Sequence, residues 1–473
     1  MKHSRRDFIR TALIAPGVLA GLNGCVSMMG SPGRSLDSDP WDRVPDILRR
    51  IVAPSFPAHD VSILAHGARG DGTTDCTAAF REAISACNAA GGGRVVVPAG
   101  KYLTGAIHLR SNVNLHLQEG ATILFSRDPR AYLPVVLTRF EGTELMGYSP
   151  LIYAFEQENV AVTGAGTLDG QANRDFWWPW KGSATYGFKA GGNQQQPARD
   201  RLVQMAEDGV PVASRVFGEG SFLRPAFIEP YRCRNVLIEG VTIINSPMWE
   251  LHPTLCTNVT VRNVTISTHG PNNDGCDPES CRDVLIEGCT FDTGDDCIAI
   301  KSGRNADGRR LKTPTENVIV RNCTMKDGHG GVTIGSEISG DVRWVFTENC
   351  RMDSPQLERA LRLKNNASRG GVLEHIYMRD VTIGQVSDSI VSVDFTYEEG
   401  AKGAFTPVAR DINVQRVTSG KSKYGVFLRG FENAPITNIT LTDCRFDNVA
   451  SGNVLEHVQG YKFTNVLING KPA

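Results

Sequence analysis

A short phrase of alternating apolar and polar residues recurs along the C-terminal part of the chain. Its best-preserved copies begin at Asn235 (NVLIEGVTI), Asn258 (NVTVRNVTI), Asp283 (DVLIEGCTF) and Asn317 (NVIVRNCTM). Looser copies begin at Trp344, His375, Asp411 and Asn438. Alternation with a period of two predicts short strands. Repeats of roughly 23 to 36 residues rich in Val, Ile, Thr and Asn are typical of a solenoid, so the pattern predicts an all-β, single-stranded parallel β-helix.

One helical pattern precedes the repeats. We expect the first strand at Val61 and then a helix that starts at Thr74 and Asp75. Its apolar residues recur at helical spacing: Phe80, Ala83, Ile84 and Cys87. Three glycines end it at residues 91–93. A single amphipathic helix ahead of a solenoid is predicted to cap the apolar end of the first coil, within one domain that spans residues 59–473.

A segment at about residues 171–225 interrupts the repeat. It contains Trp177, Trp178 and Trp180, and a helix is predicted near Ala198–Glu207. An insertion of this size on a solenoid is expected to form a wall beside a cleft. The tryptophans could stack on sugar rings or fix the insertion to the body of the protein, and the sequence slightly favours packing.

The N-terminus has the pattern of an export signal. Ser4-Arg5-Arg6-Asp7-Phe8 precedes a short apolar run, which predicts a twin-arginine signal peptide over residues 1–25. Leu22–Cys25 resembles a bacterial lipobox, with Cys25 as the lipid-bearing residue; the alternative is an ordinary signal-peptidase site. Residues 26–58 are then a tether and lead-in. We expect a periplasmic or membrane-anchored protein, as an outer-membrane lipoprotein would be.

Composition and charge agree with one large soluble-type domain. Hydrophobic residues make up 41% of the chain and the net charge is −1, so no overall charge attracts an acidic polymer. The 12 cysteines show no zinc-ligand spacing, and several recur in the repeat phrase as small apolar residues would. No disulfide framework is required. No basic helix or aromatic stacking platform suggests a nucleic-acid partner.

A basic loop follows the strand that ends at Ile300. It contains Lys301, Arg304, Arg309, Arg310 and Lys312. We expect this loop to rim the cleft, where positive charge suits an acidic polysaccharide. The alternative is a solvated charged loop.

Three acids and a histidine lie in Gly-rich turns that precede short strands. They are Asp274, Asp295, Asp296 and His329. Asp295 follows Val284 by 11 residues and His329 follows Val318 by 11, so both should lie on one face of neighbouring coils. One coil further on, the strand ALRLKN places Arg362 and Lys364 on one side. Single turn acids are usually structural, but this column of ionisable residues indicates a site.

These motifs resemble those of a known family. Asn272-x-Asp274-Gly, Gly-Asp295-Asp296, Gly-His329-Gly and Arg362-x-Lys364 are similar, in order and spacing, to the four signatures of glycoside hydrolase family 28, the polygalacturonases, and to its bacterial branch. Asn273 stands where Thr is usual, and Gly294 where Gln is common. The resemblance implies a right-handed β-helix and hydrolysis of α-1,4-galacturonan with inversion, without metal or cofactor.

The resemblance also implies a role for each residue. Asp295 is the general acid, Asp274 and Asp296 hold the attacking water, and His329 tunes the acid. Arg362 and Lys364 bind the substrate carboxylate, Asn272 orients the substrate, and Tyr397 contacts a sugar. Inverting hydrolysis predicts two carboxyl groups about 6.5–9.5 Å apart. A neighbouring negative charge is expected to raise the pKa of the acid.

Other functions stay open at this point. A pectate lyase shares the fold class but uses calcium, and Gly-His329-Gly does not fit it. A related hydrolase could act on rhamnogalacturonan or xylogalacturonan, and a non-catalytic β-helix could merely bind carbohydrate. The insertion and the basic loop should close one end of the groove into a pocket. We therefore expect cleavage from the end of the chain.

Overall fold

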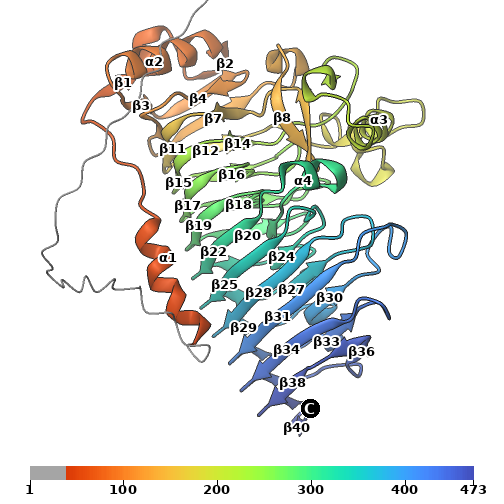
Figure 1. Ribbon diagram of the computed structural model, residues 1–473. Helices are drawn as coiled ribbons and strands as arrows, with labels where there is room; N and C mark the ends of the chain where they lie inside the picture. The colour runs from red at the N-terminus through yellow and green to blue at the C-terminus, as the bar shows by residue number, and fades with distance from the viewer. Residues whose placement is uncertain (1–38) are drawn as a thin grey trace, which may run out of the picture. The chain divides into compact units, whose positions relative to one another are not determined.

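Each coil adds short strands to three parallel sheets, which run side by side along the stack (Figure 1). The computed structural model describes residues 39–473; the predicted signal peptide, Cys25 and the first part of the predicted tether lie outside the described residues. Residues Arg43–Ala473 form one unit, which holds all of these sheets. The predicted parallel β-helix is confirmed.

The first sheet runs from the capped end to the C-terminus. Its strands, in spatial order, are β1 (Asp60–Ser62), β3 (Gly93–Val97), β6 (Val113–Leu117), β11 (Glu158–Gly164), β15 (Arg234–Glu239), β17 (Thr257–Arg262), β19 (Arg282–Glu287), β22 (Thr315–Arg321), β25 (Val342–Glu348), β28 (Val372–Arg379), β31 (Val408–Gln415), β34 (Ile436–Thr442) and β37 (Val458–Gln459), with β38 (Lys462–Thr464) also on β34.

The second sheet follows the first along every coil. Its strands are β2 (Asp71–Asp75), β4 (Gly100–Thr104), β7 (Ala121–Phe125), β12 (Thr167–Asp169), β16 (Thr242–Ile244), β18 (Thr265–Thr268), β20 (Thr290–Thr293), β23 (Thr324–Met325), β26 (Arg351–Met352), β29 (Thr382–Ile383), β32 (Thr418–Ser419), β35 (Arg445–Phe446), β39 (Leu467–Ile468) and β40 (Lys471–Pro472).

The third sheet has two parts joined by single bridges at Leu251 and Cys276. Its strands are β5 (Ile107–His108), β10 (Ile152–Phe155) and β14 (Ile228–Tyr231), then β21 (Ile298–Ile300), β24 (Val332–Ile334), β27 (Arg359–Lys364), β30 (Ser389–Asp394), β33 (Tyr424–Arg429) and β36 (Val454–Glu456). A separate small sheet comprises β8 (Val136–Phe140), β9 (Thr143–Gly147) and β13 (Val216–Phe217).

The repeat phrase sets the register of the first sheet. Its first apolar residues stack directly on one another: Val236, Val259, Val284, Val318, Val345, Ile376, Ile412 and Ile439. The residue before each of them has a positive φ of 56–60°, a conformation that Asn and Asp adopt more readily than most residues. The Asn258 amide donates to the Asn235 side chain at 2.7 Å. The recurring Asn therefore forms a structural ladder.

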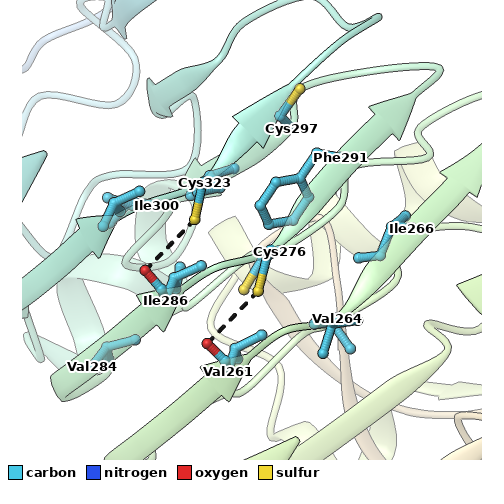
Figure 2. Close-up of a cluster of buried hydrophobic side chains, with 14 of the residues drawn as sticks. Val261, Val264, Ile266, Cys276, Val284, Ile286, Phe291, Cys297, Ile300 and Cys323 are labelled. Atoms are coloured by element: carbon cyan, nitrogen blue, oxygen red, sulfur yellow. Dashed lines mark hydrogen bonds between the residues drawn. The ribbon is translucent and has the colours of Figure 1, made fainter. Parts of the chain in front are cut away.

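The cysteines of the repeat are core residues. All 11 cysteines of residues 39–473 are buried thiols, and no disulfide joins any of them. Figure 2 shows Cys276 and Cys323 among Ile286, Phe291 and other apolar side chains, and the Cys323 thiol donates to the Ile286 carbonyl at 3.7 Å. They fill the core as small hydrophobic side chains.

The capping helix starts later than its sequence predicts. Besides the 3-10 turns η1 (Pro40–Arg43), η2 (Ile63–His66), η3 (Pro129–Tyr132), η4 (Trp178–Lys181), η5 (Ala184–Tyr186) and η6 (Val212–Ser214), the helices are α1 (Val44–Arg50), α2 (Thr77–Ala89), α3 (Gln196–Glu207) and α4 (Asn305–Leu311). The predicted start at Thr74 and Asp75 is wrong because both residues belong to β2. Asp75 instead accepts hydrogen bonds from the Thr77 backbone N–H and hydroxyl, at 2.8 and 2.5 Å.

The lead-in segment, for which the sequence predicts no element, packs beside the first sheet. Helix α1 lies beside the stack of coils in Figure 1, and Arg50 forms an ion pair with Asp283 at 2.8 Å. The backbone of Val52 then exchanges two hydrogen bonds with the Asn258 side chain. Among residues 39–473, no helix has both the length and the apolar character needed to cross a membrane.

Candidate active site

The predicted acids and histidine lie in turns of neighbouring coils, just before strands of the third sheet. Asp295 and Asp296 precede β21, and His329 precedes β24. Backbone hydrogen bonds join these turns: Gly275 N–H donates to the Asp296 carbonyl and His329 N–H to the Asp295 carbonyl, each at 3.0 Å. Equal offsets in the sequence thus correspond to stacked turns.

The three acids form one cluster. One carboxylate oxygen from each of Asp274, Asp295 and Asp296 lies within 4.8 Å of the others. This is closer than the separation of about 6.5–9.5 Å expected for an inverting pair. Stacking explains the difference, because strands of neighbouring coils are only about 4.8 Å apart. Asp274 and Asp296 are buried, whereas the Asp295 side chain is 20% exposed and can reach a ligand.

Asp296 is held by the two predicted cations. Lys364 Nζ lies 2.8 Å from Oδ2 of Asp296 and Arg362 Nη1 lies 3.2 Å from Oδ1, while the Thr333 hydroxyl donates to Oδ1 at 2.8 Å. Burial raises the pKa of Asp296, but Lys364 and Arg362 outweigh it and the pKa falls well below its usual range. Both cations therefore bind the carboxylate of Asp296.

Asp295 and His329 form a second pair. His329 Nδ1 lies 2.9 Å from Oδ1 of Asp295, and the His329 side chain is 47% exposed. The hydrogen bond that Asp295 accepts from protonated His329 raises the pKa of the histidine. Burial raises the pKa of Asp295, but this hydrogen bond and the charges of His329 and Lys364 lower it below its ordinary value. The sequence predicts a raised pKa for Asp295, whereas the contact with His329 helps to lower it.

The raised pKa falls on Asp274 instead. Burial is the main cause, and the charges of Asp295 and Asp277 add to it. Like charges this close oppose one another's ionisation, and of the three acids Asp274 is the one whose pKa is raised.

A third cation, Lys301, lies next to the buried carboxylate of Asp274. Its ammonium is buried 3.5 Å from Asp274, 3.2 Å from Asp277 and 3.4 Å from Glu337, and 4.4 Å above the centre of the Trp249 ring. Lys301 lines the cavity, as predicted for the basic loop, but it is buried and paired with three acids. The alternation on β21 could have revealed this, because Ile298 and Ile300 face the core and so direct Lys301 outward toward the acids.

Two arginines of the predicted basic rim, Arg304 and Arg310, are also paired with carboxylates. Arg304 is buried near Glu141 at 3.5 Å and Glu337 at 3.6 Å, and Arg310 contacts Glu144 at 2.6 Å. Helix α4 occupies most of this segment. Its arginines therefore bind carboxylates from the β8–β9 hairpin and the β24 turn rather than forming a free basic edge.

Asn272 is fixed by an arginine that the sequence does not single out. Arg224 is fully buried, and its Nη2 donates to Oδ1 of Asn272 at 2.8 Å while Nη1 donates to two backbone carbonyls.

The two departures from the family motifs are structural. Asn273 makes four hydrogen bonds in the turn, and a Cβ at Gly294 would lie 2.5 Å from the Gly270 carbonyl.

Tyr397 lies beside the two cations that hold Asp296. Its ring centre is 5.2 Å from Lys364 Nζ and 5.5 Å from the Arg362 guanidinium. It lines the same cavity as Asp295. The position suits a side chain that contacts a sugar next to these cations.

The tryptophans of the insertion pack against the body of the protein. Trp177 is buried, with its ring 5.5 Å from Tyr132 and 4.9 Å from Trp180, and Trp178 donates to the Ser246 carbonyl at 2.8 Å. These contacts agree with the packing interpretation.

The acids open into a small cavity of about 90 Å³. Its walls come from the insertion, the β8–β9 hairpin, the acid turns, and the turns after β24 and β30. The lining residues are Glu141, Lys181, Arg199, Trp249, Asn272, Asp274, Asp295, Lys301, Ser336, Glu337, Lys364, Tyr397 and Glu398. The structure thus brings Asn272, Lys364 and Tyr397 together with Asp274 and Asp295 in one cavity, which Asp296, His329 and Arg362 do not line.

A larger groove of about 990 Å³ lies elsewhere, between residues 53–58 and the first sheet. Its main charges are already paired, Arg94 with Asp60 at 2.6 Å and Arg262 with Glu239 at 2.7 Å. It lacks a cluster of acids, so the small cavity is the better candidate for chemistry.

Comparison with known proteins agrees with this site. The profile "Glycosyl hydrolases family 28" matches residues 219–464, just over half of the chain, and "Rhamnogalacturonase A/epimerase, pectate lyase-like" matches residues 61–116. A solved structure of a hyperthermoactive exopolygalacturonase from Thermotoga maritima is 48% identical, with a TM-score of 0.89 over 91% of this chain and 96% of that one.

Two other relatives are more distant in sequence. An exo-poly-alpha-D-galacturonosidase from Dickeya chrysanthemi is 27% identical over 87% of this chain and 74% of its own length. A probable polygalacturonase from Vitis vinifera is 29% identical over 83% of this chain and 75% of its own. With the β-helix, the stacked acids and the profile match in agreement, the chain belongs to glycoside hydrolase family 28.

Proposed function

We propose that this chain hydrolyses α-1,4-galacturonosyl linkages of pectic chains and releases the terminal sugar. The observation that carries the proposal is a cavity of about 90 Å³ lined by Asp274, Asp295 and several cations, with Lys181 and Arg199 of the insertion in its wall. A cavity walled by an insertion favours a chain end, whereas an open groove would accept the middle of a polymer. The exo-acting relatives from Thermotoga and Dickeya add support.

The acids divide the chemistry between them. Asp295, the partly exposed acid, donates a proton to the leaving glycosidic oxygen. Asp274 and Asp296 hold a water whose oxygen bonds to the anomeric carbon, and a carboxylate takes its proton. A bound galacturonate carboxylate would draw cationic charge away from Asp295 and raise the pKa of that acid, which favours the protonated form that donates to the glycosidic oxygen.

The cations and Tyr397 position the sugar. Among the described residues, Arg362 donates to Asp296 through Nη1 alone, which leaves other donors of its guanidinium for a substrate carboxylate. Lys364 and Tyr397 line the cavity. Asn272, which is held by a hydrogen bond from Arg224, lines it as well. Because the sugar in the cavity carries the attacked anomeric carbon, the proposal makes it the non-reducing end of the chain.

Inversion of the anomeric centre is the expected stereochemistry. In the inverting reaction a water held by Asp274 and Asp296, and not a carboxylate oxygen, bonds to the anomeric carbon, so the first product has the configuration opposite to that of the α-linkage. Proton NMR of the first product should therefore show the β-anomer; an initial α-anomer would contradict this route.

Calcium-dependent lysis is the second candidate reaction, and the charges argue against it. Both oxygens of Asp296 already face Lys364 and Arg362, and Lys301 faces Asp274, so buried cations compete with a calcium ion there.

We expect polygalacturonate digested with a calcium chelator present to yield saturated sugars at an undiminished rate, with little fall in viscosity. Unsaturated, calcium-dependent products would favour the lyase. Rhamnogalacturonan and xylogalacturonan, assayed in parallel, should be poor substrates.

We propose export and lipid attachment at the N-terminus, from the twin-arginine pattern and Cys25. A lipoprotein remains with membranes, so Cys25→Ser should move the protein from the membrane fraction to the soluble periplasmic fraction. Wild-type protein that is already soluble in the periplasm would rule out the anchor.

A further inference from the structure

One cation of the cavity has no partner of its own. Among residues 39–473, Lys364 and Arg362 contact Asp296, Lys301 contacts three acids, and Arg199 contacts Glu141 at 2.6 Å. The Lys181 ammonium forms neither an ion pair nor a hydrogen bond with any described residue. It nevertheless lines the cavity and is partly buried.

The position of Lys181 is defined by the insertion. It is the last residue of η4, directly after Trp180, whose ring packs on Trp177 at 4.9 Å and on Phe222 at 5.2 Å. The backbone carbonyl of Trp180 accepts from Gln195 N–H at 2.7 Å, which ties η4 to the start of α3. The lysine therefore extends from a packed wall rather than from a free loop.

The surroundings of Lys181 favour an incoming anion. Burial lowers the pKa of Lys181, Arg224 and Arg199 lower it further, and Glu141 and Asp295 oppose them. Glu141 itself lies between Arg199 and Arg304, so its charge is already shared. A partly buried ammonium without a close counter-ion gains most from a carboxylate that enters the cavity.

We propose that Lys181 binds the carboxylate of the terminal galacturonate and thereby selects the charged end of the chain. This inference rests on the proposed function. Lys181 lines the same cavity as Asp274 and Asp295, so a sugar whose linkage meets these acids lies in the cavity that holds the lysine. Lys364 lines the same cavity, but it and Arg362 are already bound to Asp296, so Lys181 is the lining cation that remains for this carboxylate among the described residues.

The test compares Lys181→Met with Lys189→Met, which removes an exposed lysine of the same insertion. The substrates are trigalacturonate and the same trimer with its non-reducing terminal carboxylate methyl-esterified. We expect Lys181→Met to lower kcat/KM on trigalacturonate on the order of 10- to 100-fold, mainly through KM, because a charged hydrogen bond is lost. On the ester, which lacks the anion, wild type and variant should differ by less than about threefold. Lys189→Met should match wild type on both substrates.

Lys181→Arg serves as the second variant, because it keeps the charge and should retain most of the activity. Equal losses by Lys181→Met on both substrates, or no loss on either, would overturn the inference while leaving the proposed function intact. A wild-type protein that cleaves neither trimer would instead refute the proposed function. The thermal unfolding midpoint of each variant shows whether the substitution has lowered the stability of the protein or has only removed a contact with the substrate.

Discussion

Asp295→Asn is expected to remove nearly all turnover while leaving the fold intact. The amide cannot donate a proton as an acid does, and general acid catalysis contributes on the order of 100- to 10,000-fold. The side chain is partly exposed, and its main partner is the half-exposed His329, so little stability depends on its charge. The measurement is kcat on trigalacturonate, together with the thermal unfolding midpoint.

Asp292→Asn is the matched control for this change. Asp292 also contacts a histidine, His269, at 2.9 Å, but it does not line the cavity. Its variant should retain wild-type turnover. Asp295→Asn should also bring the pKa of His329 back toward its ordinary value, because the carboxylate that raises it is gone. A wild-type rate from Asp295→Asn would refute the assignment of the acid.

The second large effect is expected from Lys301→Met. The change leaves Asp274, Asp277 and Glu337 buried without the cation that faces all three. Removing one partner of a buried charge group typically costs about 3–5 kcal/mol of unfolding free energy. Urea unfolding at neutral pH measures the loss, and Lys326→Met, on an exposed turn of the next coil, is the control that should change nothing.

The pH dependence of this variant has a definite sign. Burial already raises the pKa of Asp277 to about 7 despite Lys301, and the pKa of Asp274 is raised as well. Without Lys301 both pKa values rise further, so the folded state binds more protons than the unfolded state. The gap in stability between variant and wild type should therefore shrink as the pH falls toward about 7, where wild-type Asp277 also takes up a proton. A gap that does not change between about pH 9 and about pH 7 would mean that packing, and not charge, is responsible.

The repeat made much of the fold predictable. Its apolar residues stack residue on residue in the first sheet, and the offset from Val284 to Asp295 equals that from Val318 to His329. A fixed coil length carries this register into space, so neighbouring turns could be paired from counting alone. Helix α2 was predictable on its buried face, but its start was displaced because Thr74 and Asp75 pair as strand β2.

The charges around the site could not be predicted in the same way. Arg304 and Arg310 look exposed in the sequence, yet their carboxylate partners Glu141 and Glu144 lie in a hairpin more than 160 residues earlier. That hairpin lies outside the repeat, so no periodicity links it to α4. The pKa order of the acids depends on these long-range partners, on His329 for Asp295 and on Lys364 for Asp296.

The central claim is that water attacks the terminal sugar held in the closed cavity. Hexagalacturonate digested briefly in ¹⁸O-labelled water, followed by mass spectrometry, tests it most directly, with an enzyme-free incubation to correct for exchange. The account predicts galacturonate monomer carrying the label and an unlabelled pentamer. Labelled dimers and trimers from the first moments, a labelled pentamer with unlabelled monomer, or products without label would contradict it.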